Sequence, residues 1–553
     1  MKSESSFSKV IHLLVLTGFL CTLSVSCKKD NDKDTNTDGV ETPVDIAPTT
    51  GSRNDMIKDS VFLYARQIYL WWREIPDYNS FKPRRFTGSS PIDALDEELY
   101  AITRYGINPA NNKPYEFRPA SNGSDTGIPK YSYFTDADDQ NPSAPLSLAK
   151  KSAVDLEGNG LDFGIRADAY GEATNYKLYI EAVYPGSDAA KKGLKRGDYI
   201  SKINGTEIGT NYNSQYNLIW SSLESSSSVS LTVQKGDGSG EVNLPPINRT
   251  SYASSPVLKE AILNGVGSQR IGYMAYARFS NLTNSLPEFT RVFNTFASQG
   301  VTDLIIDLRY NGGGYVSTAE YLINFIAPSS LNGKVMYAEH FNELMQAGKA
   351  TILSRKLILD AFGKSQDSNN DGKLDTYADV SYDIASNTRH FSKKGSLNNI
   401  SRVVFIVSGS TASASELVIN SLEPYLDVKI VGETTYGKPV GFFPIRFDNY
   451  DMYLSMFESR NARNEGGYFL GITPDTGNST ADNDNPAYDF GDIREASLKA
   501  AYSYLTQGSL LASTKSSTNV SSNGVKALEL PGKLNKADKE FKGMIEDRII
   551  VRR

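Results

Sequence analysis

The chain has 553 residues, and its 58 Lys and Arg against 64 Asp and Glu give a formal net charge of −6 at pH 7. This length suggests about three domains, and the mild acidity argues against a nucleic-acid partner, which a basic surface would attract. The two cysteines are Cys21 and Cys27, and the three histidines are His12, His340 and His390. This inventory excludes a disulfide framework or thiolate metal site beyond residue 27, and it excludes an HExxH centre.

The first 27 residues form a candidate export signal. Lys2 and Lys9 precede an apolar run over 10–23, and small residues follow up to Cys27. The run is shorter than the ~20 residues that span a bilayer, and the pattern is typical of a secretory signal peptide. A cysteine at this place resembles a bacterial lipobox, although Ser24 stands where leucine is usual. We therefore expect Cys27 to be lipidated, with ordinary signal cleavage as the alternative.

That resemblance implies an exported lipoprotein of the Bacteroidetes type, anchored to the outer membrane by its lipid alone. The anchor would face the periplasm or the cell surface, because residues 29–32 resemble surface-export signals only loosely. Residues 28–55 are rich in Asp, Thr, Asn and Pro and predict a flexible tether.

Residues 56–150 predict an N-terminal helical region. Apolar residues from Val61 to Trp72 recur at three- and four-residue spacing, and Asp59-Ser60 can cap the start of this helix. A second helix is predicted from Pro91 to Tyr105, with acidic residues in its first turn and a glycine directly after it.

Residues 151–250 predict a β domain with strands over 178–183 and 229–233. Between them, the stretch from Pro185 to Gly205 reads P-G-S-D-A-A-K-K-G-L-K-R-G-D-Y-I-S-K-I-N-G. It resembles a PDZ domain of the bacterial protease type. The resemblance implies that a sheet edge accepts a peptide strand, or else that the domain is only a spacer. It places the carboxylate-binding loop at Leu161, Asp162, Phe163, Gly164 and Ile165.

Residues 265–508 predict an α/β domain. Continuous apolar runs of the kind that parallel sheets bury on both faces alternate with helical patterns. The predicted strands are Ile271–Ala275, Asp303–Leu308, Val403–Val407 and Val428–Val431, and the predicted helices are Leu286–Ala297, Tyr315–Ile326 and Ser415–Leu426.

Three segments of this domain carry chemical patterns: D-L-R-Y-N-G-G-G over 307–314, V-S-G-S-T-A-S-A-S-E over 407–416 and V-G-E-T-T-Y-G-K-P-V-G over 431–441. The first could be a phosphate cradle or an oxyanion hole, but it lacks the usual phosphate-binding glycine patterns. The second could hold a nucleophilic serine or simply cap a helix. His340 and His390 lie outside glycine-rich turns, so a buried lysine with a lowered pKa, Lys438, is the simplest base.

The three segments, in this order after a PDZ domain, resemble the carboxyl-terminal processing proteases of the S41 serine peptidase family. The resemblance implies a ClpP/crotonase-like α/β core. It places the nucleophile at Ser413, the base at Lys438 and the oxyanion donors at Gly313 and Ala414, with Gly312 a weaker candidate for the first. The family often has a glutamine four residues after the lysine, and here that position is Phe442.

The expected function is hydrolysis of peptide bonds in envelope proteins by a Ser-Lys dyad, with the PDZ domain recruiting C-terminal or unfolded segments. Protein or peptide substrates are the expected partners, and no cofactor is required. The alternative is an inactive lipoprotein with an S41-like core that binds peptides or a hydrophobic ligand. A relative of acyl-CoA hydratases would fit the core alone, but not the PDZ domain or the export signal.

One polar stretch, D-S-N-N-D-G-K-L-D over 367–375, has the oxygen spacing of a calcium loop without its final glutamate. The candidate Ca²⁺ ligands are Asp367, Asn369, Asp371 and Asp375, and a polar surface insertion is the alternative. Residues 509–553 form a C-terminal tail to which the sequence assigns no role.

Overall fold

The structure is a computed structural model that describes residues 39–120, 122–136, 154–359, 364–368, 370–476, 484–510 and 543–545. The predicted signal peptide, the lipidation site at Cys27 and residues 28–38 of the predicted tether lie outside these residues. Within the described ranges, no helix is both long and apolar enough to cross a membrane.

The N-terminal region packs directly on the α/β domain. Its apolar side chains, such as Phe62 and Leu99, belong to the same buried cluster as those of the α/β sheet. The region contains α1 (Arg53–Ile68), η1 (Trp72–Glu74), α2 (Tyr78–Phe81), η2 (Pro83–Arg85), α3 (Pro91–Ile102), β1 (Ile107–Asn108), β2 (Lys113–Pro114) and β3 (Tyr133–Asp136).

Three expectations for this part of the chain are corrected. The first helix begins at Arg53, because the side chain of Ser52 caps it by accepting a hydrogen bond from Asp55 N–H. Val40 is buried, and Asp45 forms an ion pair with Arg66, so the predicted tether does not extend through these residues. The region is also not purely helical, since β3 pairs with β24 (Tyr450–Tyr453) of the α/β domain.

The PDZ-like domain has its own apolar core. Its main sheet has the order β11-β10-β7-β6-β5, so β5 is an edge strand in the described part of the chain. Ser187 caps α4, and Asn204 and Gly205 close the β7–β8 hairpin. The elements are β4 (Asn159–Asp162), β5 (Ile165–Glu172), β6 (Asn175–Val183), α4 (Asp188–Lys191), β7 (Tyr199–Ile203), β8 (Thr206–Glu207), α5 (Tyr212–Glu224), β9 (Ser228–Val229), β10 (Leu231–Gln234), β11 (Glu241–Asn243), β12 (Ile247–Asn248) and β13 (Thr250–Ala253).

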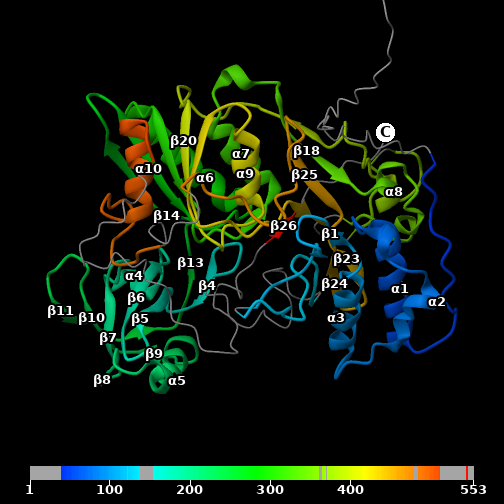
Figure 1. The fold of residues 1–553 in the computed structure, drawn as a ribbon, viewed down its shortest axis with the longest axis horizontal. Coiled ribbons are helices and arrows are strands. Elements are labelled where there is room, and N and C mark those ends of the chain that lie inside the picture. Colours follow the sequence, from blue (N-terminus) through cyan, green and yellow to red (C-terminus); the bar gives the residue numbers. More distant parts are fainter. Residues whose placement is uncertain are drawn as a thin grey trace, which may run out of the picture. The chain divides into compact units, whose positions relative to one another are not determined.

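The α/β domain is built on a five-stranded sheet of order β14-β15-β16-β20-β21 (Figure 1), in which β14 alone runs antiparallel to its neighbour. Leu304 and Ile306 face the buried cluster that contains the helices α6, α7 and α9, whereas Ile305 faces the cluster that contains α10. Burial on both faces explains the continuous apolar runs. The elements are β14 (Val257–Asn264), β15 (Arg270–Tyr276), α6 (Leu282–Ser298), β16 (Asp303–Asp307), α7 (Val316–Ile326), β20 (Arg402–Val407), α9 (Ala414–Leu422), β21 (Asp427–Gly432) and α10 (Ala496–Gln507).

Smaller sheets surround the edge of this layer. One has the order β19-β18-β25-β22, another is β23-β24-β3, and a third pairs β17 with the C-terminal strand β26, drawn in red in Figure 1. The remaining elements are β17 (Gly313–Tyr315), η3 (Ser329–Leu331), β18 (Val335–Phe341), α8 (Glu343–Gln346), η4 (Thr351–Arg355), η5 (Tyr377–Asp379), β19 (Thr388–His390), β22 (Val440–Gly441), β23 (Ile445–Phe447), β25 (Phe457–Asn461) and β26 (Gly543–Ile545).

The fold class predicted from sequence is confirmed: a multidomain α/β protein with N-terminal helices, a PDZ-like β domain and a helix-covered α/β core. All four predicted strands and all three predicted helices of the core are present. The third helix is shorter than expected and ends at Leu422.

Candidate active site

The three chemical segments follow the carboxyl ends of three neighbouring parallel strands. Residues 308–314 follow β16, residues 408–413 follow β20 and residues 433–438 follow β21. Ligands of open parallel sheets bind outside this edge. Backbone hydrogen bonds join the segments, because Ala412 N–H donates to Asn311 O (3.1 Å) and Tyr436 N–H donates to Thr411 O (2.9 Å).

Ser413 occupies a strained turn directly before α9. Its φ of 62° lies in a region that residues with a side chain rarely adopt, at a cost of about 1–3 kcal/mol. The residue is fully buried, and its Oγ has no hydrogen-bond partner among the described residues. A serine held on a sharp strand-to-helix turn with an unengaged hydroxyl is the arrangement that a nucleophile requires.

The buried carboxylate of Glu416 connects the backbone of Ser413 to that of Lys438. Its Oε2 accepts hydrogen bonds from Ser413 N–H (2.7 Å) and Lys438 N–H (2.9 Å), and its Oε1 accepts from Gly437 N–H (2.7 Å) and from the hydroxyl of Thr435. Burial raises the pKa of Glu416, although these hydrogen bonds favour its carboxylate form. Glu416 therefore fixes the two loops against each other.

Lys438 is fully buried, and burial lowers its pKa from 10.5 to about 7. The carboxylates of Glu116 and Glu416 act in the opposite direction and favour the charged amine. Nζ lies 3.5 Å from the carbonyl oxygen of Tyr131, in the N-terminal region. Ser413 and Lys438 are not hydrogen-bonded to each other as they stand, and catalytic contacts of this kind often tighten only when substrate binds.

Phe442 stands where the family often has a glutamine, and its ring lies against the lysine. The distance from Lys438 Nζ to the ring centroid is 4.2 Å, and Phe442 is fully buried. An aromatic face attracts a cation, so this contact favours the protonated amine and partly opposes desolvation. The aromatic ring and the Tyr131 carbonyl thus replace an amide as the neighbours of Nζ.

Replacing Phe442 by leucine is expected to lower the pKa of Lys438 further. Leucine keeps the site apolar but removes the aromatic face, and a cation–π contact contributes about 1 kcal/mol, or somewhat less than one pKa unit. The acid limb of a kcat/KM profile for peptide hydrolysis should move to lower pH by about half a unit to one unit. An unchanged or upward-shifted limb would show that the ring does not stabilise the charged amine.

The N–H groups of the two predicted oxyanion donors, Ala414 and Gly313, differ in their hydrogen bonding. Ala414 is the first residue of α9, where N–H groups have no partner within the helix and favour negative charge. Gly313 lies beside Ser413, because a Cβ added to it would come within 2.9 Å of Ser413 Cβ. Its N–H, however, donates to Asn311 Oδ1 at 2.9 Å. Gly313 N–H can donate to an oxyanion only if its hydrogen bond to Asn311 Oδ1 is broken.

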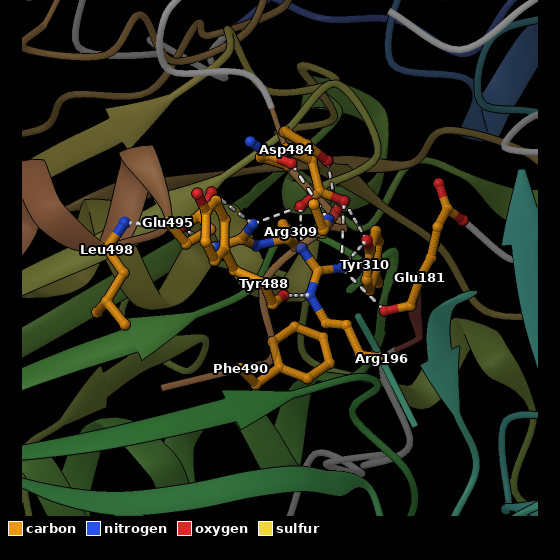
Figure 2. Close-up of polar contacts among 12 residues, drawn as sticks. Glu181, Arg196, Arg309, Tyr310, Asp484, Tyr488, Phe490, Glu495 and Leu498 are labelled. Carbon is orange, nitrogen blue, oxygen red and sulfur yellow. Dashed lines mark hydrogen bonds and ion pairs between the residues drawn. The ribbon is translucent and has the colours of Figure 1, made fainter. Parts of the chain in front are cut away.

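A buried ion network holds the first segment and joins it to the PDZ-like domain (Figure 2). Arg309 forms ion pairs with Asp307 (2.9 Å), Glu495 (3.1 Å) and Asp484 (2.5 Å), and Asp484 also pairs with Arg196 of the PDZ-like domain. The two arginines hold the pKa of Asp484 far below its usual range, although burial alone would raise it. The backbone before the glycines is therefore anchored by charge.

Replacing Asp484 by asparagine is expected to destabilise the protein by about 3–5 kcal/mol, because two buried guanidinium groups lose a shared carboxylate. Urea unfolding would measure the loss. The matched control is Asp489→Asn in the same segment, whose ion pair with Lys259 is exposed and should contribute less than about 1 kcal/mol. Equal effects of the two substitutions would contradict the proposed importance of the network.

The residues predicted to bind a peptide in the PDZ-like domain lie at the start of the edge strand. Gly164 N–H already donates to Asp162 Oδ1 (2.6 Å), which also accepts from the hydroxyl of Tyr252 (2.7 Å). Phe163 is buried and Leu161 is exposed, whereas Ile165 begins β5 and pairs with Val183. Leu161 and Asp162 belong to β4, which pairs with β13, so the predicted loop is engaged internally by strand pairing as well as through Gly164 N–H.

The candidate calcium loop is held by its own backbone. Asp367 accepts from the N–H groups of Asp371 and Gly372 (both 3.1 Å), and the buried Asp375 accepts from Ser368 N–H (2.7 Å). Asn369 lies outside the described residues. Among those that are described, no three acidic, cysteine or histidine side chains gather as metal ligands would. The calcium site remains a prediction.

Sequence reasoning missed two contributors to the site. Glu416 stands three residues after Ser413, which is the S-x-x-E spacing of a helix N-terminus and could have identified it. Tyr131 comes from a region that gave no chemical signal, and its position depends on the pairing of β3 with β24.

Comparison with known proteins agrees with this organisation. Residues 270–477 match the model of peptidase family S41, and residues 179–235 match a PDZ domain. A C-terminal processing peptidase of the chloroplast of Tetradesmus obliquus is 24% identical over 306 residues, which cover 54% of each chain. A carboxyl-terminal-processing protease of Picosynechococcus is 25% identical over 297 residues, covering 54% of this chain and 58% of the relative.

A crystal structure from Bacteroides fragilis, described as an S41 protease, supports the same fold. It has a TM-score of 0.50 and 20% identity, and the match covers 83% of this chain and 98% of that one. The chain spans just over half the length of the curated relatives it matches.

Proposed function

We propose, from the match of residues 270–477 to peptidase family S41, that the protein is a serine endopeptidase that uses Ser413 and Lys438. The observation that carries the proposal is the shared carboxylate oxygen of Glu416, which holds the backbones of a buried serine and a buried low-pKa lysine. The comparisons do not favour an inactive binding protein, because the named relatives are processing peptidases.

In the proposed reaction, the neutral amine of Lys438 removes the proton from Ser413 Oγ as that oxygen attacks the peptide carbonyl carbon. Ala414 N–H and a glycine N–H of the first segment stabilise the oxyanion. Lys438 then gives the proton to the departing amine, which leaves an ester on Ser413. A water molecule hydrolyses the ester by the same proton transfers, so the products are two peptides and the free enzyme.

The PDZ-like domain would recruit C-terminal or unfolded segments of envelope proteins to this centre. Its edge strand β5 and the loop over 161–165 are the elements to which such a peptide would add. Export and lipidation at Cys27 are part of the proposal on the grounds of sequence alone. Incorporation of a labelled fatty acid, lost in Cys27→Ala, would support the lipid anchor.

Incubation of the purified protein with a disordered polypeptide, with and without an appended apolar C-terminal tail, tests the proposal. Mass spectrometry should find internal cleavage of both, and the tail-bearing polypeptide should disappear faster. Intact polypeptide after prolonged incubation would contradict the endopeptidase. Cleavage at equal rates would contradict only the role of the PDZ-like domain.

A further inference from the structure

The C-terminal strand β26 lies inside the candidate active site. Gly543–Ile545 pairs in parallel with Gly313–Tyr315 of β17, and Ile545 also bridges to Phe442. One neighbour of this strand contains the glycine beside Ser413, and the other contains the ring beside Lys438. This strand therefore lies between the glycine segment next to Ser413 and the aromatic residue that packs on Lys438.

The backbone of this strand closely approaches the nucleophile. Gly543 N–H donates to Gly312 O at 3.1 Å. A Cβ built on Gly313 would meet the carbonyl oxygen of Gly543 at 2.5 Å and Ser413 Cβ at 2.9 Å. The carbonyl oxygen of Gly543 and the Cβ of Ser413 are therefore no farther apart than the sum of these two distances. The Gly543 carbonyl therefore lies in the neighbourhood of Ser413, where a substrate carbonyl would also have to bind.

Two apolar side chains of the segment occupy separate sites. Met544 is fully buried, and its sulfur lies 3.4 Å from the hydroxyl oxygen of Ser459 on β25. Ile545 joins a buried cluster with Tyr133, Phe442 and Tyr453. The two side chains point to opposite faces, as they must in a strand, so each meets its own surface.

We propose that β17 and Phe442 form the peptide-binding groove of the catalytic centre, that this groove selects an extended Gly–apolar–apolar segment, and that residues 543–545 occupy it in cis and compete with substrates. The proposal rests on the proposed function for its consequence, inhibition of hydrolysis, but not for the binding itself. β-strand addition supplies backbone hydrogen bonds, and the Met544 and Ile545 sites supply selectivity.

Tethering makes this competition effective. Residues 511–542 connect Leu510 covalently to Gly543, so the segment is present near the groove at the millimolar concentrations typical of tethered ligands. A substrate added at micromolar concentration therefore competes with a large local excess. Weakening the segment should strengthen binding of a peptide in trans.

The test measures binding in a Ser413→Ala background, which needs no hydrolysis. A fluorescent peptide with the sequence of residues 542–546 (K-G-M-I-E) is titrated into S413A, S413A/M544D and S413A/S509D. The aspartate replaces the buried Met544 and so weakens docking of the tail while its site stays intact, whereas Ser509 is exposed and serves as the control for charge. We expect M544D to tighten binding about tenfold or more and S509D to leave it unchanged. A K-G-D-I-E peptide should bind at least about tenfold more weakly.

Equal affinities for the three variants, or no saturable binding to S413A/M544D, would overturn the proposal. If M544D does not fold, a site-specific cleavage sequence inserted between residues 525 and 526 allows the tail to be cut after folding. Excess K-G-M-I-E peptide should then displace the C-terminal fragment. A fragment that stays bound would show that β26 is a permanent strand of the fold.

In the Ser413-containing protein, M544D should lower KM for an added polypeptide and leave kcat nearly unchanged. Absence of hydrolysis in both proteins, with the expected peptide binding, would reject the peptidase and retain the groove. Hydrolysis that M544D does not affect would retain the peptidase and reject the competition by residues 543–545.

Discussion

Replacing Ser413 by alanine is expected to lower kcat/KM for a disordered polypeptide by about 10⁴-fold or more, because no other group can form the ester intermediate. Alanine keeps Cβ, so the strained turn at φ 62° and the hydrogen bond from residue 413 N–H to Glu416 should persist. The circular dichroism spectrum and the melting temperature should therefore stay close to those of the wild type. Steady-state hydrolysis with a mass-spectrometric readout measures the loss.

The control for this substitution is Ser410→Ala, in the same loop and three residues away. No catalytic contact is assigned to its hydroxyl, so activity should stay within about threefold of wild type. If the Ser413→Ala protein cleaved the substrate at the wild-type rate, the nucleophile would have to be another residue.

Replacing Lys438 by methionine should lower activity by a similarly large factor. Unlike Ser413→Ala, it should also raise the stability of the protein. Methionine has a similar length and apolar character but cannot accept a proton, so kcat/KM should fall by about 10³- to 10⁴-fold. Holding the amine neutral against its ordinary pKa of 10.5 costs about 5 kcal/mol in a folded state where the pKa is about 7. Removing the amine should therefore stabilise the protein near neutral pH.

The pH dependence gives this prediction a sharper form. Between pH 7 and 10.5 the unfolded chain protonates Lys438 and the folded protein does not, so the free energy of unfolding rises with pH by about 1.4 kcal/mol per unit from this group. Lys438→Met should lose that slope, as urea unfolding at several pH values would measure. Lys499→Met, on the exposed face of α10, should retain it. Identical slopes in all three proteins would show that the lysine titrates normally.

The sequence could predict the core because its signals are local. Continuous apolar runs such as Val403–Val407 mark strands buried on both faces, and the turn residues around Ser187 and Gly205 match the PDZ pattern in the structure. The loops at the ends of β16, β20 and β21 could be predicted to lie close together, because parallel strands end at one edge of a sheet.

The missed features depend on contacts between distant parts of the chain. Residues 40–52 pack on the body of the protein through distant partners, and the hydroxyl of Thr42, for example, donates to the carbonyl oxygen of Lys349. Local composition cannot reveal such a partner. The aromatic neighbour of Lys438 follows from the path of the chain after β22. β26 consists of three residues in a polar tail, and only its pairing with β17, more than 200 residues earlier, gives it a role.

The central claim is that a buried, neutral amine activates Ser413, and direct titration of that amine tests it. Protein carrying ¹³Cε-lysine would be followed by NMR from pH 5 to 11, with the Lys438 signal assigned by its loss in Lys438→Met. The account predicts a midpoint of about 7 that coincides with the acid limb of kcat/KM. A midpoint near 10.5, with hydrolysis already at its plateau at pH 8, would contradict it.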